Sequence, residues 1–291
     1  MIVRHPRKAL LFLAPAAIIY LVVIIYPLIA SVRLSLTDSP AGGAGEFVGL
    51  DNFVQMFNDQ DVIDAMWRSI AFAVVVCIFQ NGIALAIARA FYSRPRQQRV
   101  YSVLVLLPML ISPVMAAFIW SAFYSPDGVI NTVLSNVGLD GLTRIWLGDP
   151  DIALWAIAVV NIWMFIGFSA AIFYAGYMNM PSDLLEAARI DGAGGLRRFW
   201  SIEWPLLAPS LTVNVTLSLI GSLKVFEFPL VMTNGGPAES TTTLTMLIYE
   251  KIFGGQGLFS YGVTIAVLLL VVVVVLSGIV NTVLRRREER I

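Results

Sequence analysis

Six long apolar runs divide the chain, and they limit what it can fold into more than any other feature. Each run exceeds 20 residues, which is enough for a helix to cross about 30 Å of hydrocarbon at about 1.5 Å per residue. They lie at Ala9–Val32, Ser69–Phe91, Val100–Tyr124, Ile152–Gly176, Leu206–Phe228 and Tyr261–Leu284. Lipid offers no partner for backbone N–H and C=O groups, so each run must be helical. The sequence therefore predicts an all-α integral membrane protein with six transmembrane helices.

The composition agrees with a lipid environment. Of the 291 residues, 58% are hydrophobic and 13% are charged, whereas a soluble domain carries roughly 25% charged residues. Net charge is zero, which gives no indication of a nucleic-acid partner. The chain has one cysteine, Cys77, and one histidine, His5. These numbers predict no disulfide framework, no His/Cys metal site and no histidine-based catalytic triad.

The first apolar run follows three basic residues, as the core of a cleaved signal peptide does. This run is longer than the apolar core of a signal peptide, which has roughly 7–15 residues. No small-x-small cleavage motif follows it. We therefore expect a retained span. The whole chain, 1–291, is predicted to be one transmembrane domain with a peripheral first span at 9–32 and a five-span core at 69–284.

The connecting segments alternate in charge. The basic side chains are Arg4, Arg7, Lys8, Arg89, Arg94, Arg96, Arg99, Arg189, Arg197, Arg198, Arg285, Arg286, Arg287 and Arg290. The acidic loops contain Asp38, Glu46, Asp51, Asp59, Asp61 and Asp64, then Asp127, Asp140, Asp149 and Asp151, then Glu239 and Glu250. Lysine and arginine mark cytoplasmic loops. Both termini are therefore predicted to be cytoplasmic (N-in/C-in), as is the loop at 177–205.

Two prolines interrupt the third run. Pro108 and Pro113 stand in "LLPMLISPVM", where each removes a helical hydrogen bond and its ring clashes with the preceding turn. The sequence predicts a kink or a break in this helix. A kink tolerated without any functional role is the alternative.

The 177–205 loop keeps unusual charge in "LLEAARIDGAGGLRRFWSIEWPLLAP". Ser182 supplies a helix start, Asp183 lies in the first turn, and Gly192 is a natural stop. A second short helical segment, "GLRRFWSIEW", follows the glycines. On composition alone, an amphipathic helix pair lying on the inner leaflet is an alternative. The glycines form no phosphate-binding loop, because "GAGGLRR" lacks the lysine and hydroxyl of that motif. Any ATP hydrolysis must therefore occur on another polypeptide.

This loop resembles the EAA loop of the membrane subunits of binding-protein-dependent ABC importers. The family's pattern is Glu-Ala-Ala, three residues, Gly, nine residues, Ile-x-Leu-Pro. The residues in register are Glu186, Ala187, Ala188, Gly192, Ile202 and Pro205. Trp204 stands where the family usually has leucine.

Further segments resemble sugar-importing permeases related to the maltose and glycerol-phosphate systems, over roughly Ala14 to Leu284. They include "YPLIASVRLSLT", "FVGLDNFVQMF" and "SLKVFEFPLVMTNGGPAESTTTLTMLIYEKIF". The resemblance implies a second homologous permease subunit, two cytoplasmic ATPase subunits that bind ATP and Mg, an extracytoplasmic solute-binding protein, and the bacterial cytoplasmic (inner) membrane. The residues implied in coupling to the ATPase are Glu186, Ala187, Ala188, Arg189, Asp191, Gly192, Ile202, Trp204 and Pro205.

A solute path needs polar groups at mid-membrane depth. On the fifth run, three polar side chains recur at helical spacing on one face. The candidate path residues are Asn161, Trp163, Asn214, Ser218, Ser222, Lys224 and Glu227. Amides and hydroxyls suit sugar hydroxyls, and Trp120 or Trp163 suits a sugar face. Alternatively, these polar groups serve as interhelical hydrogen bonds of about 0.6 kcal/mol each, and Lys224 is a snorkelling lysine paired with Glu227. Gln80 and Asn81 are assigned to packing.

Two other function classes remain to be weighed. An ion-coupled secondary carrier normally has buried carboxylates at mid-depth, and the cores of the six runs contain none. A membrane-embedded enzyme would need His, Cys or paired carboxylates in the spans. The leading interpretation is therefore a non-enzymatic permease subunit of an ABC importer for a carbohydrate or sugar derivative.

Overall fold

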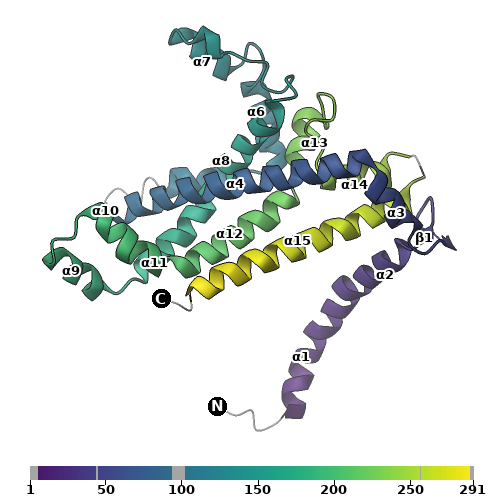
Figure 1. The fold of residues 1–291 in the computed structure, drawn as a ribbon, viewed down its shortest axis with the longest axis horizontal. Helices are drawn as coiled ribbons and strands as arrows, with labels where there is room; N and C mark the ends of the chain where they lie inside the picture. Colours follow the sequence, from purple (N-terminus) through teal and green to yellow (C-terminus); the bar gives the residue numbers. More distant parts are fainter. Residues whose placement is uncertain (1–5, 44, 94–101, 256, 289–291) are drawn as a thin grey trace. The chain divides into compact units, whose positions relative to one another are not determined.

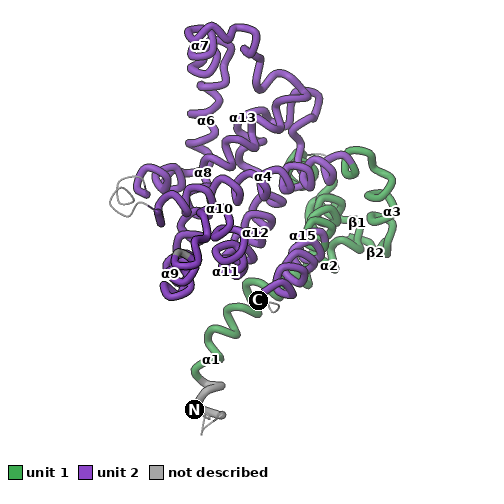
Figure 2. The backbone as a smooth tube through the Cα atoms, turned by 60° about the vertical axis from the view of Figure 1, so that its left-hand side comes forward, with its two compact units in different colours: residues 1–63, 247–271 green, residues 64–246, 272–291 purple. Residues whose placement is uncertain are grey.

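The computed structural model describes residues 6–43, 45–93, 102–255 and 257–288, without the side chains of residues 6–11 and of Arg189. Several residues used to predict the orientation lie outside these ranges: Arg4, Arg94, Arg96, Arg99 and Arg290, together with His5. The chain divides into two compact units, residues 1–63 with 247–271 and residues 64–246 with 272–291 (Figure 2).

Four described helices are long and apolar enough to cross a membrane (Figure 1). They are Phe12–Leu34, Gln60–Ser93 (α4), Ala153–Met178 (α8) and Phe259–Glu288 (α15). Two bent helix pairs raise the number to six if each pair is one span. This confirms the prediction of a mainly helical chain with several helices of membrane-spanning length, and the count of six stays a prediction.

The first unit contains the N-terminal helices, a small sheet and the beginning of α15. Its elements are α1 (Pro6–Tyr20), the π-helix η1 (Leu21–Ile25), α2 (Tyr26–Leu34), β1 (Thr37–Asp38), β2 (Glu46–Phe47), α3 (Asp51–Asn58) and most of α14 (Leu244–Phe253). β1 and β2 pair in antiparallel register, Thr37 opposite Phe47. The start of α15 is held by Ser260, whose hydroxyl accepts the backbone N–H of Ser39 at 3.0 Å.

The second unit contains the predicted loop and the helices around it. Besides most of α4 and the end of α15, its elements are a helical segment at Ser102–Leu110 that ends in the 3₁₀ turn η2 (Leu107–Leu110), α6 (Pro113–Phe123), α7 (Val129–Asn136), η3 (Asp140–Leu142), α8, α9 (Ser182–Ile190), α10 (Gly195–Arg198), the π-helix η4 (Phe199–Glu203), α11 (Trp204–Leu206), α12 (Ala208–Leu223) and α13 (Glu227–Thr233).

α8 is the central helix of this unit, because buried residues along its length contribute to two apolar clusters. Ile157 and Met164 belong to the same cluster as Phe72 of α4, and Phe173 belongs to the other cluster, with Leu207. Close packing extends to the backbone at Gly167. A Cβ at Gly167 would lie 2.1 Å from the carbonyl oxygen of Val105. Only glycine allows α8 to approach the Ser102–Leu110 segment this closely.

The third predicted span is broken between Leu110 and Pro113, as its two prolines lead one to expect. Ser102–Leu110 and α6 meet at 104°. Ile111 is extended, and the Ser112 hydroxyl accepts the backbone N–H of Met115 at 3.4 Å as a helix cap. Pro113 at the first helical position suits such a start, since it has no N–H to satisfy there.

The fifth predicted span, Leu206–Phe228, differs from the structure. α12 ends at Leu223, and α13 begins afresh at Glu227. Pro229 accounts for the break, because its ring would clash with the carbonyl of Val225 in an uninterrupted helix. That carbonyl instead accepts a hydrogen bond from the Thr243 hydroxyl at 3.0 Å.

Candidate functional sites: the 177–205 loop and a polar cavity

The 177–205 loop folds as helix, glycine break and second helix, as the sequence predicts. α9 ends where Gly192 takes the left-handed conformation, at φ +69°. The backbone N–H of Ala193 then bonds to the carbonyl of Ala188 at 2.9 Å. This is the six-to-one hydrogen bond of a glycine-terminated helix.

The two faces of α9 differ. Leu185 and Ala188 are buried against the rest of the chain. Glu186 and Ala187 are exposed, as are Asp191 and Gly192 after the helix. Ile202, Trp204 and Pro205 are half-buried, and the side chain of Arg189 lies outside the described part. Half of the EAA pattern therefore faces away from its own chain.

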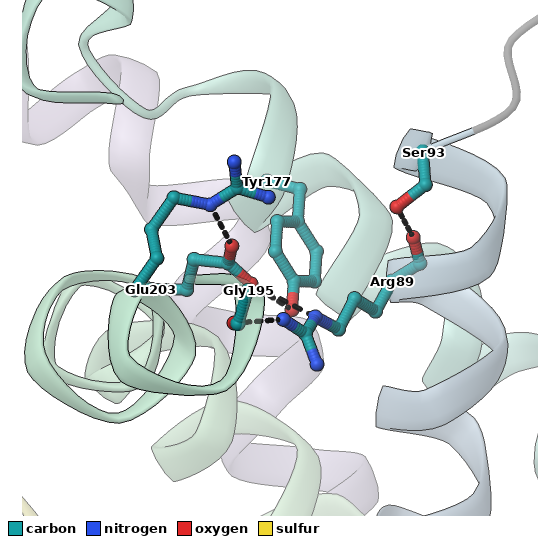
Figure 3. Close-up of polar contacts among 6 residues, drawn as sticks. Arg89, Ser93, Tyr177, Gly195 and Glu203 are labelled. Atoms are coloured by element: carbon teal, nitrogen blue, oxygen red, sulfur yellow. Dashed lines mark hydrogen bonds and ion pairs between the residues drawn. The ribbon is translucent and has the colours of Figure 1, made fainter. Parts of the chain in front are cut away.

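The loop itself contains a buried carboxylate. Glu203 of η4 is 2% exposed. Its Oε1 accepts Arg198 Nε at 2.8 Å, and its Oε2 lies 3.1 Å from Arg89 Nε of α4 (Figure 3). The Tyr177 hydroxyl, at the end of α8, donates to Oε2 at 3.3 Å. Arg89 Nη2 also donates to the carbonyl of Gly195 at 2.6 Å.

Sequence reasoning missed this cluster. It treated Arg89 only as a mark of loop orientation and gave Glu203 no role. The available signal was a single acid within the otherwise apolar turn "FWSIEWPLL". Nothing in the sequence identifies the partner of that acid, because Arg89 lies two spans earlier.

Trp204, the departure from the family pattern, lies in an aromatic cluster. Its ring is 5.8 Å from Trp200 and 6.2 Å from Phe199. The guanidinium carbon of Arg287, near the end of α15, lies 4.7 Å from the Trp204 ring centroid. The neighbouring Glu288 accepts a hydrogen bond from the Thr212 hydroxyl. The end of α15 thus contacts the loop through the cation–π interaction of Arg287 with Trp204. A leucine at position 204 could not make this interaction.

Trp204→Leu is expected to lower stability. Leucine loses the cation–π contact with Arg287, worth about 0.5–1 kcal/mol at a partly exposed site, and the ring contacts with Trp200 and Phe199, worth about 0.5–1.5 kcal/mol. Tm of the purified protein should fall by about 2–10 °C. Arg287→Gln in the Trp204→Leu background should add little. A full additional decrease from Arg287→Gln would show that Trp204 is not its partner.

A cavity of about 330 Å³ lies between α4, α8, α12 and the start of α13. Most of its wall is apolar, and we call it the polar cavity after the seven polar side chains that the wall also contains. This volume is within the range of small-molecule sites, about 300–1,000 Å³. Its polar lining comes from Gln80, Asn161, Ser169, Ser218, Ser222, Lys224 and Glu227. Five of the seven predicted path residues are therefore brought together here.

The other two predicted path residues lie elsewhere. Asn214 is buried, and its Nδ2 donates to the carbonyl of Ser169 at 3.1 Å. Trp163 lines a separate apolar groove with Trp155 and Phe79, and its ring makes an edge contact with Trp120 at 5.4 Å. Neither is placed to meet a solute in the polar cavity.

The amides of the cavity differ in their partners. Gln80, assigned to packing, also lines the cavity, and its Nε2 donates to the Ser169 hydroxyl at 2.8 Å. Asn81 donates to the Ser218 hydroxyl at 2.9 Å, which fits its packing assignment. Asn161 is 5% exposed, yet its side chain forms no hydrogen bond with any other described residue. A buried amide of this kind is suited to bind a polar ligand.

The local Lys224–Glu227 pair is not formed. No ion pair joins these two residues in the described structure, because the helix that would place them three apart on one face ends at Leu223. Both side chains line the cavity separately. Among the described residues, no group of three or more His, Cys, Asp or Glu could hold a metal ion.

Comparison with known proteins identifies the family of this chain. Residues 80–290 match the family described as "Binding-protein-dependent transport system inner membrane component". The chain is 33% identical over 290 residues to the sulfoquinovosyl glycerol transport system permease protein SmoG of Agrobacterium fabrum, covering 96% of this chain and 91% of that protein. It is 34% identical over 265 residues to the sn-glycerol-3-phosphate transport system permease protein UgpA of Escherichia coli, covering 89% and 88%.

A solved structure supports the same assignment. The chain superimposes with a TM-score of 0.81 on a chain of a bacterial ABC transporter involved in the import of the acidic polysaccharide alginate. The two are 26% identical, and the match covers 97% of this chain and 96% of the other. The family match includes both the polar cavity and the loop with its exposed EAA residues. The chain therefore belongs to the family of inner membrane components of binding-protein-dependent transport systems.

Proposed function

We propose that this chain is the permease subunit of an ATP-driven ABC importer that moves a carbohydrate or sugar derivative from an extracytoplasmic binding protein into the cytoplasm by alternating access. The observation that supports this most strongly is the family match over residues 80–290. The relatives are named for sulfoquinovosyl glycerol and sn-glycerol-3-phosphate, and the solved transporter imports alginate. A sugar or polyol derivative is the solute class common to these names.

The proposed solute site is the polar cavity. Sugar hydroxyls both donate and accept hydrogen bonds, and amide side chains do the same. Asn161 and Gln80 from two helices, with Ser218 and Ser222 from a third, can surround such a solute. Lys224 and Glu227 add one cationic and one anionic group at the same cavity.

The proposed contact with the ATPase is the exposed part of the EAA pattern. Small residues such as Ala187 and Gly192 allow close backbone approach by a partner, and Glu186 and Asp191 offer charges that set its register. This supports a coupling role for the set Glu186, Ala187, Ala188, Arg189, Asp191, Gly192, Ile202, Trp204 and Pro205. Leu185 and Ala188, which are buried, attach α9 to its own chain.

The proposed assembly follows from the family and from charge sorting. It has six spans, with both termini and the 177–205 loop, between the fourth and fifth spans, in the cytoplasm of a bacterium. Its partners are a second homologous permease subunit, two ATPase subunits that bind ATP and Mg, and a solute-binding protein outside the inner membrane. The solved alginate transporter, which shares this fold, is itself an ABC transporter.

Co-purification tests the assembly. The tagged chain, extracted in mild detergent from its own organism, is expected to bring one second six-span chain and two copies of an ATPase subunit for each tagged chain. A chain that purified alone and transported solute in vesicles without ATP would instead be an ion-coupled carrier.

Cysteine labelling tests the orientation. In a Cys77→Ser background, Ser182→Cys should react with a membrane-impermeant maleimide only after the membrane is opened. Asp140→Cys should react from outside in intact cells. Both positions are exposed, so access to the reagent depends on the side of the membrane. The opposite labelling pattern would overturn the N-in/C-in proposal.

Two asparagines distinguish solute binding from packing. Asn161→Leu is expected to reduce uptake by about tenfold with little change in Tm, because it removes an amide that bonds to no described residue. Asn214→Leu is expected to lower Tm, because it removes the hydrogen bond to the carbonyl of Ser169. Solute dependence of uptake and thermal unfolding are measured for both. If Asn161→Leu left uptake unchanged, the cavity would not be the solute path.

A further inference from the structure

We propose that Glu203 is a positioning residue that joins the 177–205 loop to the ends of α4 and α8, so that these helices follow the loop when the ATPase moves it. The inference rests on the proposed function, since it needs an ATPase acting on the loop. It concerns residues outside the EAA pattern and outside the cavity. Their role is to transmit a movement, not to contact solute or ATP.

The geometry places one carboxylate at the meeting point of three elements. Arg198 belongs to α10, Arg89 to α4 and Tyr177 to α8. The carboxylate binds one arginine through each oxygen, at 2.8 Å and 3.1 Å. Tyr177 donates a third hydrogen bond, to the same oxygen as Arg89 (Figure 3).

The burial of Glu203 opposes any movement that separates it from Arg198, Arg89 and Tyr177, and we call this set of contacts the joint. Glu203 is 2% exposed, and a buried charge that loses its partners is strongly unfavourable because no water replaces them. A longer and less buried ion pair gives a useful contrast. Arg68 and Asp64, four apart on α4, are 3.8 Å from each other, and the Asp64 side chain is 46% exposed. Pairs of this kind that water can reach contribute little.

Arg89 contacts the loop at three points. Besides Glu203, it donates to the carbonyl of Gly195 at 2.6 Å and lies 4.6 Å from the centroid of the Phe199 ring. Sliding of the loop along α4 would break all three contacts together. The loop and the end of α4 are therefore expected to move as one body. Because α4 contributes Gln80 to the polar cavity, this motion reaches the proposed solute site.

The test uses the complete complex with its binding protein, reconstituted in lipid vesicles. Glu203→Gln and Arg89→Gln are compared with Arg68→Gln, which removes another half-buried α4 arginine whose acidic partner is largely open to water. The readout is ATP hydrolysed per solute imported, with ATPase activity and Tm measured on the same samples. Glu203→Gln is expected to raise this ratio by about tenfold or more, because Arg89 and Arg198 lose the buried carboxylate that both contact. Arg68→Gln should leave it unchanged.

The double variant distinguishes the loss of the Glu203–Arg89 contact from a general loss of folded complex. If Glu203 and Arg89 act through their contact, combining the two substitutions should be no worse than the more damaging single substitution. An unchanged ATP-to-solute ratio in Glu203→Gln would overturn the proposal. It would also be overturned if ATPase activity and import fell in proportion, since that would indicate only loss of folded complex.

A second variant decides the matter if Glu203→Gln does not assemble. Arg89→Lys keeps a positive charge near Glu203 Oε2 but lacks the forked guanidinium that also reaches the carbonyl of Gly195. A raised ratio with normal assembly supports the joint, and a normal ratio overturns it. Failure of the unsubstituted complex to import solute with ATP would contradict the proposed function itself, which keeps the two outcomes distinct.

Discussion

Gly167→Ala is expected to be among the most destabilising single-methyl changes in this chain. The added Cβ would lie 2.1 Å from the carbonyl oxygen and 2.8 Å from the carbonyl carbon of Val105, and 3.1 Å from the Cα of Leu106. All three are backbone atoms, so no rotamer change relieves the overlap. Overpacking of this kind costs about 3 kcal/mol. Tm of the purified protein should fall by about 10 °C.

Gly82→Ala is the matched control for that substitution. Gly82 also lies inside a long helix, α4, but a Cβ there meets no heavy atom within 4 Å. Alanine should stabilise this helix by about 0.5–1 kcal/mol, because glycine loses more backbone freedom on folding. If both variants had the same Tm, α8 would not approach the Ser102–Leu110 segment as the structure has it.

Gly192→Arg is expected to abolish import while leaving the loaded binding protein able to dock. Gly192 is exposed and has φ +69°, with nothing within 4 Å of its Cβ position. Arginine there strains the turn by about 1–2 kcal/mol and places a bulky charge on the surface proposed to meet the ATPase. Uptake should fall by about 100-fold or more, as a contact that needs close approach is lost. Uptake and binding-protein docking are measured on the same vesicles.

Gly192→Asn distinguishes the effect of backbone strain in the turn from the effect of a bulky charged side chain on its surface. Asparagine tolerates the left-handed conformation better than most residues, and its side chain is short and uncharged. Most import should survive. Equal loss in the asparagine and arginine variants would attribute the effect to the turn alone. Normal import by the arginine variant would contradict the coupling role of the loop.

Local chemistry made much of the fold predictable. Long apolar runs predicted the long helices, and Pro108 and Pro113 predicted the break in the third. The effect of Pro229 was missed, although its ring excludes a continuous helix through Val225. The 104° bend could not be predicted, because the angle depends on what the two halves pack against.

The candidate sites were predictable to a different extent. Polar residues in the spans predicted Asn161 and Ser218, which do line one cavity. Trp163 is two residues beyond Asn161, and two residues turn a helix by about 200°, so it faces elsewhere. The Glu203 cluster needs two residues far apart in the sequence to meet, which no local pattern specifies. The close approach of Gly167 to Val105 also joins residues far apart in the sequence, so no local pattern predicts it.

ATP-dependent uptake is the most direct test of the central claim that this chain is an importer permease energised by a separate ATPase. The purified complex in vesicles, with ATP and Mg supplied on the side of the 177–205 loop and the loaded binding protein on the other, should accumulate solute. Omitting ATP, the ATPase subunits or the binding protein should stop accumulation. Accumulation by this chain without ATP, driven by an ion gradient, would contradict the claim.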